Sequence, residues 1–156
     1  MSDYTGPGLY EIVPVVAQDK NLNVWTGTKD QGAQIKLYRR NPSTENAQFE
    51  IVSAGGAWAQ PEKGDREYHI LVVHSGLYVT AGDEPGVITQ ELRSPLDGKV
   101  RWKIVGTGDG SYQINNVNGK VQFNVRGSGT SEGTELINYH LENGNNTKFL
   151  LKVIRK

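Results

Sequence analysis

The feature that most constrains this chain is an internal threefold repeat. In each copy a tyrosine stands two residues before an isoleucine and opens a run of short apolar segments; the three tyrosines are Tyr10, Tyr68 and Tyr112. Each run ends on an aromatic residue followed two positions later by an aliphatic one, and these aromatic residues are Phe49, Trp102 and Phe149. A repeat of about 40 residues is a unit that cannot bury its own apolar face. We therefore expect the three copies to share one core that contains these six aromatic side chains.

Within each copy, apolar and polar residues alternate over a few positions between Gly, Asn, Asp and Pro, which is typical of short half-buried strands. Helical periodicity is absent. The predicted strands cover residues 9–16, 21–25, 34–38 and 48–52 in the first copy, 68–73, 77–80, 87–92 and 100–105 in the second, and 111–115, 121–125, 134–139 and 148–154 in the third. The glycine-rich segments 54–56 and 106–110 are predicted to be turns between copies.

Short strands in three sets of four hide their edges only by closing on one another. The sequence therefore predicts an all-β fold, a β-trefoil of three pseudo-symmetric four-stranded units. Its length of 156 residues favours one domain over residues 1–156, with units at about 8–55, 66–108 and 110–156.

Composition argues against several classes of partner. Seventeen basic and seventeen acidic residues give a net charge of zero, so we expect no nucleic acid or anionic membrane as partner. The chain has no cysteine, which excludes disulfides and thiolate metal sites. No apolar stretch is long enough for membrane insertion, and the N-terminus lacks the pattern of a signal peptide. We expect cytoplasmic residence, or release by an unconventional route.

Neither a cofactor nor catalysis is indicated. His69, His74 and His140 stand on separate segments, so no metal site is expected. No pair of carboxylates recurs between the copies, and no serine has the Gly-x-Ser-x-Gly context of a hydrolase nucleophile. The chain is therefore predicted not to be an enzyme.

A set of polar residues recurs in the first and third copies. An asparagine lies three residues before the closing phenylalanine of each, and a second asparagine upstream is followed fifteen residues later by a tyrosine, with a glycine between them. These paired positions are Asn23 and Asn124, Gly32 and Gly133, Tyr38 and Tyr139, and Asn46 and Asn146. The second copy has Tyr78 and Lys99 where the asparagines would be. The second copy keeps its core and loses the polar set, as a degenerate binding repeat would.

These residues resemble the ricin-B-type β-trefoil lectins. The shared pattern is an apolar-Asn-Val strand, a glycine turn, an aromatic residue, an asparagine and the closing aromatic residue. The likeness spans essentially the whole chain. It is most specific in residues 8–14 and 21–25, which are closest to the fungal sclerotial and mushroom agglutinins for galactose and N-acetylgalactosamine. The resemblance implies a homodimeric carbohydrate-binding protein that binds terminal galactose or N-acetylgalactosamine on glycans and agglutinates cells when its sites are multiplied.

The residue types suit a galactose. Its axial 4-hydroxyl leaves one apolar ring face that can lie on an aromatic side chain, while side-chain amides and a backbone N–H in a glycine turn satisfy the vicinal hydroxyls. The predicted sugar-binding residues are Asn23, Trp25, Thr26, Gly27, Tyr38, Arg39 and Asn46 in the first unit, and Asn124, Gly127, Tyr139 and Asn146 in the third.

This chain departs from the family pattern at two kinds of position. The family commonly has Asp where Asn23 and Asn124 stand, and Gln where Ala47 and Thr147 stand. Trp25, Lys36 and Arg39 flank the first pocket and can replace what is lost, so we expect it to be the stronger; Arg126, Ile137 and His140 flank the third.

Other functions remain open on the sequence. A β-trefoil protease inhibitor would act through irregular loops such as residues 55–65, and a cytokine-like or structural trefoil would leave the repeated Asn and Tyr residues without a purpose. Trp58 lies in this insertion, outside the repeat, and is either a lid on the core or part of a subunit contact.

Overall fold

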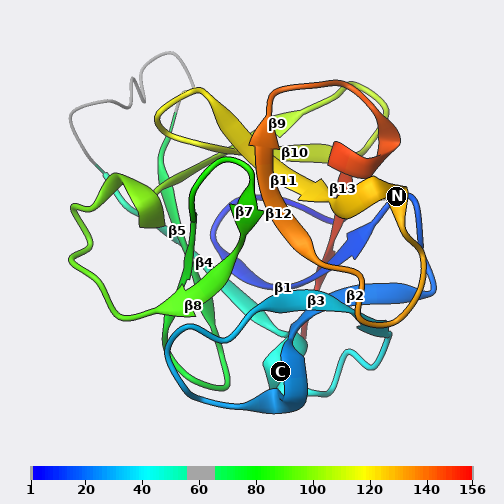
Figure 1. Cartoon of the computed structure of the whole chain (residues 1–156), viewed down its shortest axis with the longest axis horizontal. Helices are drawn as coiled ribbons and strands as arrows, with labels where there is room; N and C mark the ends of the chain where they lie inside the picture. Colours follow the sequence, from blue (N-terminus) through cyan, green and yellow to red (C-terminus); the bar gives the residue numbers. More distant parts are fainter. Residues whose placement is uncertain (1, 56–65, 156) are drawn as a thin grey trace.

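Six strands form a closed barrel in the computed structural model, which describes residues 2–55 and 66–155 (Figure 1). They are β1 (Gly8–Pro14), β4 (Phe49–Ser53), β5 (Tyr68–Val72), β9 (Trp102–Gly106), β10 (Tyr112–Asn116) and β13 (Phe149–Val153). β1 pairs with β13 and β4, β5 with β4 and β9, and β10 with β9 and β13, all antiparallel. Every barrel strand thus has two neighbours, and the ring has no free edge.

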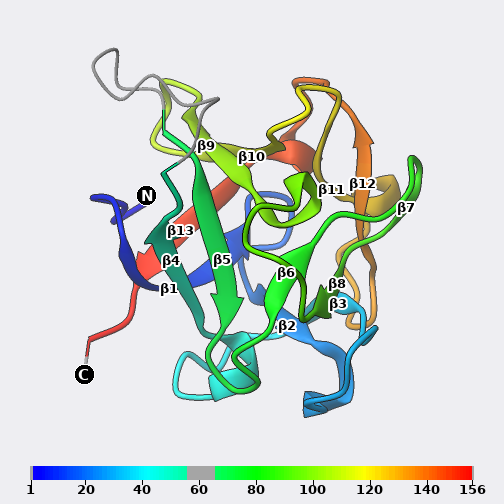
Figure 2. The same ribbon diagram turned by 90° about the vertical axis from the view of Figure 1, so that its left-hand side faces the viewer.

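Three hairpins cover one end of this barrel, and both chain termini lie at the other end (Figure 2). The hairpins pair β2 (Lys20–Val24) with β3 (Ile35–Arg39), β6 (Tyr78–Thr80) with β8 (Thr89–Glu91), and β11 (Val121–Val125) with β12 (Leu136–His140). Each unit therefore supplies two barrel strands and one hairpin, which confirms the predicted β-trefoil.

The predicted strand over residues 87–92 is interrupted. The short β7 (Gly86–Val87) pairs with β12 of the third unit, while β8 pairs with β6 of its own unit. Between them Ile88 is fully buried, donates its N–H to Leu136 O (3.1 Å) and accepts from Ile35 N (3.1 Å). The strand breaks there because its residues bond to different units.

The helical segments in the described ranges are short 3₁₀ turns. They are η1 (Trp25–Gly27), η2 (Glu45–Ala47), η4 (Gly98–Val100), η5 (Arg126–Ser128) and η6 (Asn145–Thr147). No helix in the part of the chain that the structure describes is long and apolar enough to cross a membrane.

The repeated apolar positions form the shared core. Ile12, Ile70 and Ile114 are fully buried, and so are the closing aromatic residues Phe49, Trp102 and Phe149. Trp102 and Phe149 both pack edge-on against the Phe123 ring. The buried Trp102 indole satisfies its polar atom because Nε1–H donates to Val79 O (3.0 Å).

Two of the three opening tyrosines, Tyr10 and Tyr68, are buried as predicted, whereas Tyr112 is half-buried at the margin of the core. The ring of Tyr4, from the segment before β1, packs against Tyr10 (5.4 Å between ring centroids) and Tyr112 (5.1 Å). Burial of the Tyr4 hydroxyl raises its pKa. The N-terminal segment therefore extends the core at the barrel end.

A buried ion pair holds the two chain segments that flank the insertion. Arg101 Nε donates to Glu67 Oε1 (2.8 Å), and both side chains are almost completely buried. The same guanidinium donates to the carbonyl oxygens of Pro95, Ala54 and Gly55. Trp58 and the rest of segment 56–65 lie outside the described residues, so their predicted roles stay predictions.

Asn138 is a polar residue at a core position. It is fully buried on β12, and neither its Oδ1 nor its Nδ2 has a hydrogen-bond partner. The equivalent position in the first unit, one residue before the pocket tyrosine, is the fully buried Leu37. A buried polar group without a partner loses its hydration without compensation.

We expect Asn138→Leu to raise the free energy of unfolding by about 1–3 kcal/mol, since it removes two unpaired buried polar atoms. Chemical denaturation measures the change. The control is Asn116→Leu, because Asn116 is also buried but donates to Gly98 O (2.9 Å) and Arg101 O (3.1 Å). This control should be destabilised, and equal losses in both variants would show that Asn138 is satisfied in solution.

Candidate functional site

A pocket of about 510 Å³ opens on the outer side of the β2–β3 hairpin in the first unit. All seven residues predicted for this unit line it. The complete lining is Asn21, Asn23, Trp25, Thr26, Gly27, Tyr38, Arg39, Asn41, Thr44, Asn46 and Ala47. The hairpin brings its polar residues there because Leu22, Val24 and Leu37 face the core, so the alternate residues point to the opposite side of the strands; Asn21 and Asn23 are nevertheless buried beneath the pocket.

The turn η1 forms one rim of this pocket in an unusual backbone conformation. Thr26 (φ 66°) and Gly27 (φ 68°) both lie in the left-handed region. The equivalent turn η5 repeats the conformation at Gly127 (φ 61°) and Ser128 (φ 56°). Glycine adopts this region freely, whereas a β-branched residue such as Thr26 is strained there. Strain of this kind persists where the surrounding structure imposes it, and it is concentrated at functional sites.

A chain of buried polar groups supports Asn23 from behind. Its Nδ2 donates to Asn21 Oδ1 (3.2 Å), and Asn21 Nδ2 donates to Glu11 Oε2 (3.0 Å). The Glu11 carboxylate also receives two hydrogen bonds from the Arg40 guanidinium, at 2.6 and 3.0 Å. The side chain of Glu11 is only 2% exposed, so this acid lies behind the pocket and orients the two asparagines from there.

Asn46 reaches the pocket from η2. Its Nδ2 donates to Val24 O at the end of β2 (3.0 Å), which ties the turn to the hairpin. The side chain is half-buried, with one edge on the pocket. Asn46 therefore has a structural role as well as the predicted place at the site.

Two aromatic rings form the apolar wall. Trp25 and Tyr38 meet edge to face, with ring centroids 6.2 Å apart, and Tyr38 is 40% exposed. Lys36 Nζ lies over the Trp25 ring, 4.9 Å from its centroid, so the cation contacts the face of the indole. Gly133 of the third unit packs under this indole, where an added Cβ would lie 3.5 Å from it.

Arg39 links the first pocket to the third unit. Its Nε donates to Glu132 Oε2 (3.1 Å), and its guanidinium lies 5.2 Å from the centroid of the Tyr38 ring. This hydrogen bond to Arg39 lowers the pKa of Glu132. Both side chains are well solvated, so the pair orients Arg39 at the pocket rim without adding much stability.

A second pocket, of about 450 Å³, occupies the equivalent place in the third unit and contains all four residues predicted there. Its full lining is Pro85, Gly86, Val87, Asn124, Arg126, Gly127, Ile137, Tyr139, Glu142 and Asn146. The first three belong to the second unit, which is brought here by the pairing of β7 with β12. The pocket thus has an apolar wall that crosses a unit boundary.

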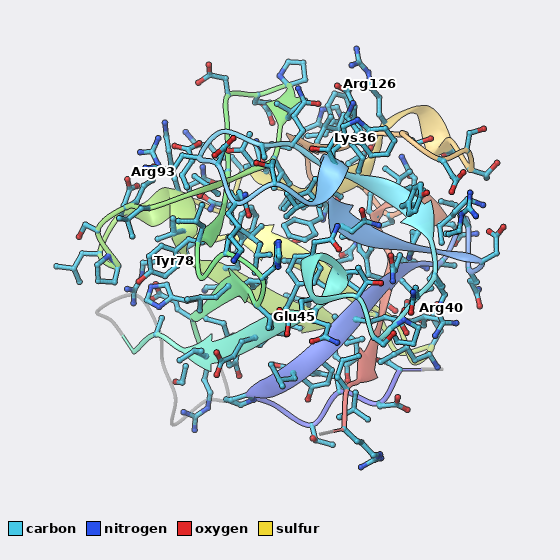
Figure 3. All side chains as sticks on the ribbon, turned by 90° about the horizontal axis from the view of Figure 1, so that it is seen from below. Lys36, Arg40, Glu45, Tyr78, Arg93 and Arg126 are labelled. Atoms are coloured by element: carbon cyan, nitrogen blue, oxygen red, sulfur yellow. The ribbon has the colours of Figure 1, made fainter. Side chains whose placement is uncertain are left out.

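The polar side of the third-unit pocket is a short hydrogen-bond chain. Asn146 Nδ2 donates to Asn124 Oδ1 (3.2 Å) and to Val125 O (3.4 Å). Asn124 Nδ2 in turn donates to Glu142 Oε1 (2.8 Å). Arg126 pairs with Glu135, whose backbone forms a bridge with that of Lys36. Lys36 and Arg126 accordingly lie at the same edge of the molecule, away from Arg93 (Figure 3).

The glycines between the paired positions act between units instead of at the pockets. Gly32 and Gly133 have φ of 85° and 89°, as a tight turn requires. Their N–H groups donate to Gln90 O (2.9 Å) and Leu37 O (2.8 Å), each in another unit. These N–H groups are therefore engaged, and neither Gly32 nor Gly133 lines a pocket; the lining glycines are Gly27 in the first pocket and Gly86 and Gly127 in the second.

In the second unit an ionic cluster stands where the pocket residues would be. The position of Tyr38 and Tyr139 is taken by Arg93, which pairs with Glu91 (2.9 Å) and Asp97 (3.0 Å). A backbone N–H from Lys99 to Asp97 lowers the pKa of this carboxyl group. Tyr78, at the asparagine position, packs against His69 with ring centroids 5.0 Å apart. In these contacts the polar groups of the second unit pair with one another, in keeping with a degenerate repeat.

Several lining residues are absent from the sequence-based set. Asn21, Asn41 and Thr44 flank residues that were predicted and could have been found by extending the same segments. Glu142 was missed because the interval from tyrosine to asparagine is one residue shorter in the third unit. Alignment on the closing aromatic residue therefore sets Glu142 against Pro42, whereas counting from the tyrosine sets it against Asn41. Pro85 and Val87 lie in another unit, which a comparison of units with each other does not reveal.

The family's glutamine position is filled by residues that face inward. Ala47 is 2% exposed and Thr147 is fully buried. Thr147 Oγ1 donates to Gly144 O (2.8 Å) and accepts from Gln113 Nε2 (2.9 Å). Across residues 2–55 and 66–155, no group of three His, Cys, Asp or Glu side chains is placed to hold a metal ion.

The closed barrel and its three hairpins make this chain a β-trefoil, with one pocket on the hairpin of the first unit and one on that of the third. The family model described as ricin-type beta-trefoil lectin domain-like matches residues 57–139. An agglutinin of Sclerotinia sclerotiorum is 32% identical over 152 residues, which cover 94% of this chain and 95% of the relative. The chain therefore belongs to the ricin-type β-trefoil lectin family, as the sequence resemblance predicted.

Solved structures agree on the fold. The designed threefold-symmetric protein ThreeFoil superposes with a TM-score of 0.79 at 23% identity, covering 92% of this chain and 97% of its own. The Rhizoctonia solani agglutinin also gives a TM-score of 0.79, at 19% identity, covering 97% of this chain and 98% of its own. At these identities the likeness establishes the fold alone.

We expect Thr26→Gly to stabilise the protein by about 1 kcal/mol, because relief of the left-handed strain outweighs the greater backbone entropy of glycine. Gly127 already occupies this position in the third unit. Thermal and chemical unfolding measure the change. Thr28→Gly is the control, since Thr28 has φ of −72° and gains nothing from glycine. If Thr26→Gly destabilises as much as this control does, Thr26 is not strained.

Proposed function

We propose that this protein is a lectin that binds terminal galactose or N-acetylgalactosamine through the pockets of its first and third units. The observation that carries the proposal is the repetition of one constellation in two pockets. Each combines an asparagine from the first hairpin strand, a tyrosine from the second strand and an asparagine from the following 3₁₀ turn. Selection for packing alone would not place the same polar set outside the core twice.

The first pocket suits the two faces of a galactose. The Tyr38 ring is exposed enough to receive the apolar face of a pyranose, and such a contact contributes on the order of 1 kcal/mol beyond area burial. Asn23 and Asn46, held by Asn21 and Val24, offer amide groups to the vicinal hydroxyls. Because neighbouring groups already hold these amides, little side-chain entropy is lost on binding.

Agglutination requires that one particle carry several sites. Two pockets on one chain make it bivalent, and the homodimer implied by the family resemblance would carry four. Linked weak sites can exceed the affinity of a single site by orders of magnitude. We propose that glycans on cell surfaces are cross-linked in this way.

Calorimetric titration with N-acetylgalactosamine, galactose and glucose tests the proposal. We expect binding of the first two sugars, little or no binding of glucose, and a stoichiometry of two per chain. Asn46→Ala and Asn146→Ala should each reduce it to one, and the double variant should not bind. Absence of binding to every sugar by the folded wild-type chain would reject the lectin proposal.

We expect Tyr38→Ala to weaken galactose binding at the first pocket about 10-fold, because the ring supplies the apolar contact. Tyr38→Phe should retain most of the affinity. The melting temperature should change little, since Tyr38 is exposed and outside the core. Measurements in an Asn146→Ala background isolate the first pocket; equal binding by Tyr38→Ala and wild type there would exclude stacking on this ring.

A further inference from the structure

Glu142 is the one acidic side chain among the described residues that line the third-unit pocket. It follows β12 in the segment that leads to η6. Its N–H donates to Gln122 Oε1 (2.9 Å), and its carbonyl oxygen accepts from Gln113 Nε2 (2.8 Å). Both backbone groups are thus anchored by amide side chains of other strands, which fixes where the Glu142 side chain begins.

The carboxylate is oriented as well. Its Oε1 accepts from Asn124 Nδ2 (2.8 Å), while its Oε2 lies 3.8 Å from His140 Nε2, at the limit of direct pairing. The side chain remains 37% exposed. The other nearby acid, Glu135, is engaged by Arg126. Glu142 therefore presents an oriented carboxylate to the pocket with acceptor capacity to spare.

The first pocket distributes its charges differently. No carboxylate is among its lining residues in the described part of the chain; the nearest acid in its polar chain is Glu11, buried behind Asn21 and paired with Arg40. In the first unit the acid supports the asparagines from the protein side. In the third unit an acid contacts Asn124 from the pocket side, where a ligand can reach it.

An ionised carboxylate is the strongest acceptor that a side chain offers to hydroxyl groups, and it can accept from two of them. The strand residues that line this pocket in the described part of the chain, Asn124, Ile137 and Tyr139, carry no carboxylate. Glu142 supplies one from the adjacent loop, bonded to the same asparagine.

We propose that Glu142 is the hydroxyl acceptor of the third-unit pocket and accepts a hydroxyl of a vicinal diol of a neutral pyranose. This inference rests on the proposed lectin function. It makes the two pockets chemically unequal. The first depends on aromatic and amide contacts, and the third depends on a charged acceptor.

The test is Glu142→Gln in the full chain, in an Asn46→Ala background that silences the first pocket. The amide keeps the shape of the side chain and an oxygen for Asn124 but loses the charge. Calorimetry with galactose should show binding about 10- to 100-fold weaker, as expected for loss of a charged hydrogen-bond acceptor. Glu50→Gln, an exposed carboxylate on β4, is the matched control and should bind as the background does.

Deoxygenated sugars separate direct contact from indirect support. One of the two analogues, 3-deoxy- or 4-deoxygalactose, lacks the hydroxyl that Glu142 accepts. For that analogue Glu142→Gln should cause no further loss of affinity, because the substitution and the deoxygenation remove the same interaction. If the losses add fully for both analogues, Glu142 does not contact these hydroxyls and the inference is rejected.

The remaining outcomes distinguish this inference from the proposed function. Unchanged affinity of Glu142→Gln would reject the role of Glu142 and leave the lectin function intact. If the wild type binds one sugar per chain and Asn46→Ala binds none, the third pocket binds no sugar. That result also rejects the inference and leaves the first pocket as the binding site. Absence of sugar binding by the wild type rejects both.

Discussion

Closure of the six-stranded ring is the constraint on which the rest of this structure depends. Each unit contributes two barrel strands, and each strand obtains its second neighbour from the unit beside it, as β4 does from β5 and β1 does from β13. No unit can satisfy its strand edges or bury its isoleucine without the others. The hairpins are tied in the same manner, since Ile88 accepts a hydrogen bond from Ile35 N in the first unit and donates its own N–H to Leu136 O in the third. The threefold pattern in the core is therefore maintained by pairing as well as by packing.

The pockets are a consequence of this closure. Because one side of each hairpin strand must face the core, the alternate residues can carry polar groups on the opposite side of the strand. Where those groups are held by a second layer, as Glu11 and Asn21 hold Asn23, the polar side of a pocket is ordered. Where the polar side chains pair with each other, as Arg93 does with Glu91 and Asp97, they fill the position that a pocket would occupy. The same scaffold thus supports a site in one unit and an internal ion cluster in another.

The fold was predictable because the pattern of apolar core residues occurs three times in the sequence. Alternation of apolar residues located the strands, and the closing aromatic residues placed the core. The break at Ile88 depends on pairing between units, which no local pattern reveals. The sites were predictable where the copies agree, as at Asn23 and Asn124. They were not predictable where a residue acts alone, as Glu142 does. The inter-unit hydrogen bonds of Gly32 and Gly133 were missed for a related reason. The same sequence offset in two copies does not identify the acceptor to which each backbone N–H donates. The roles assigned to the lining residues in sugar binding stay predictions.

Divergence between the two pockets follows from how little the core constrains them. A substitution at Asn23 or Asn124 changes hydrogen bonds outside the apolar core, so a loss in the strand can be offset by a nearby loop without a change in packing. The shorter interval between Tyr139 and Asn146 alters the loop that carries Glu142, while the backbone of Glu142 is held by Gln122 from the hairpin and Gln113 from the barrel. A loop anchored in this way can present a carboxylate as precisely as a strand can. Repeats that share a core are therefore free to acquire different ligand chemistry, provided that each new polar group finds support in its own unit.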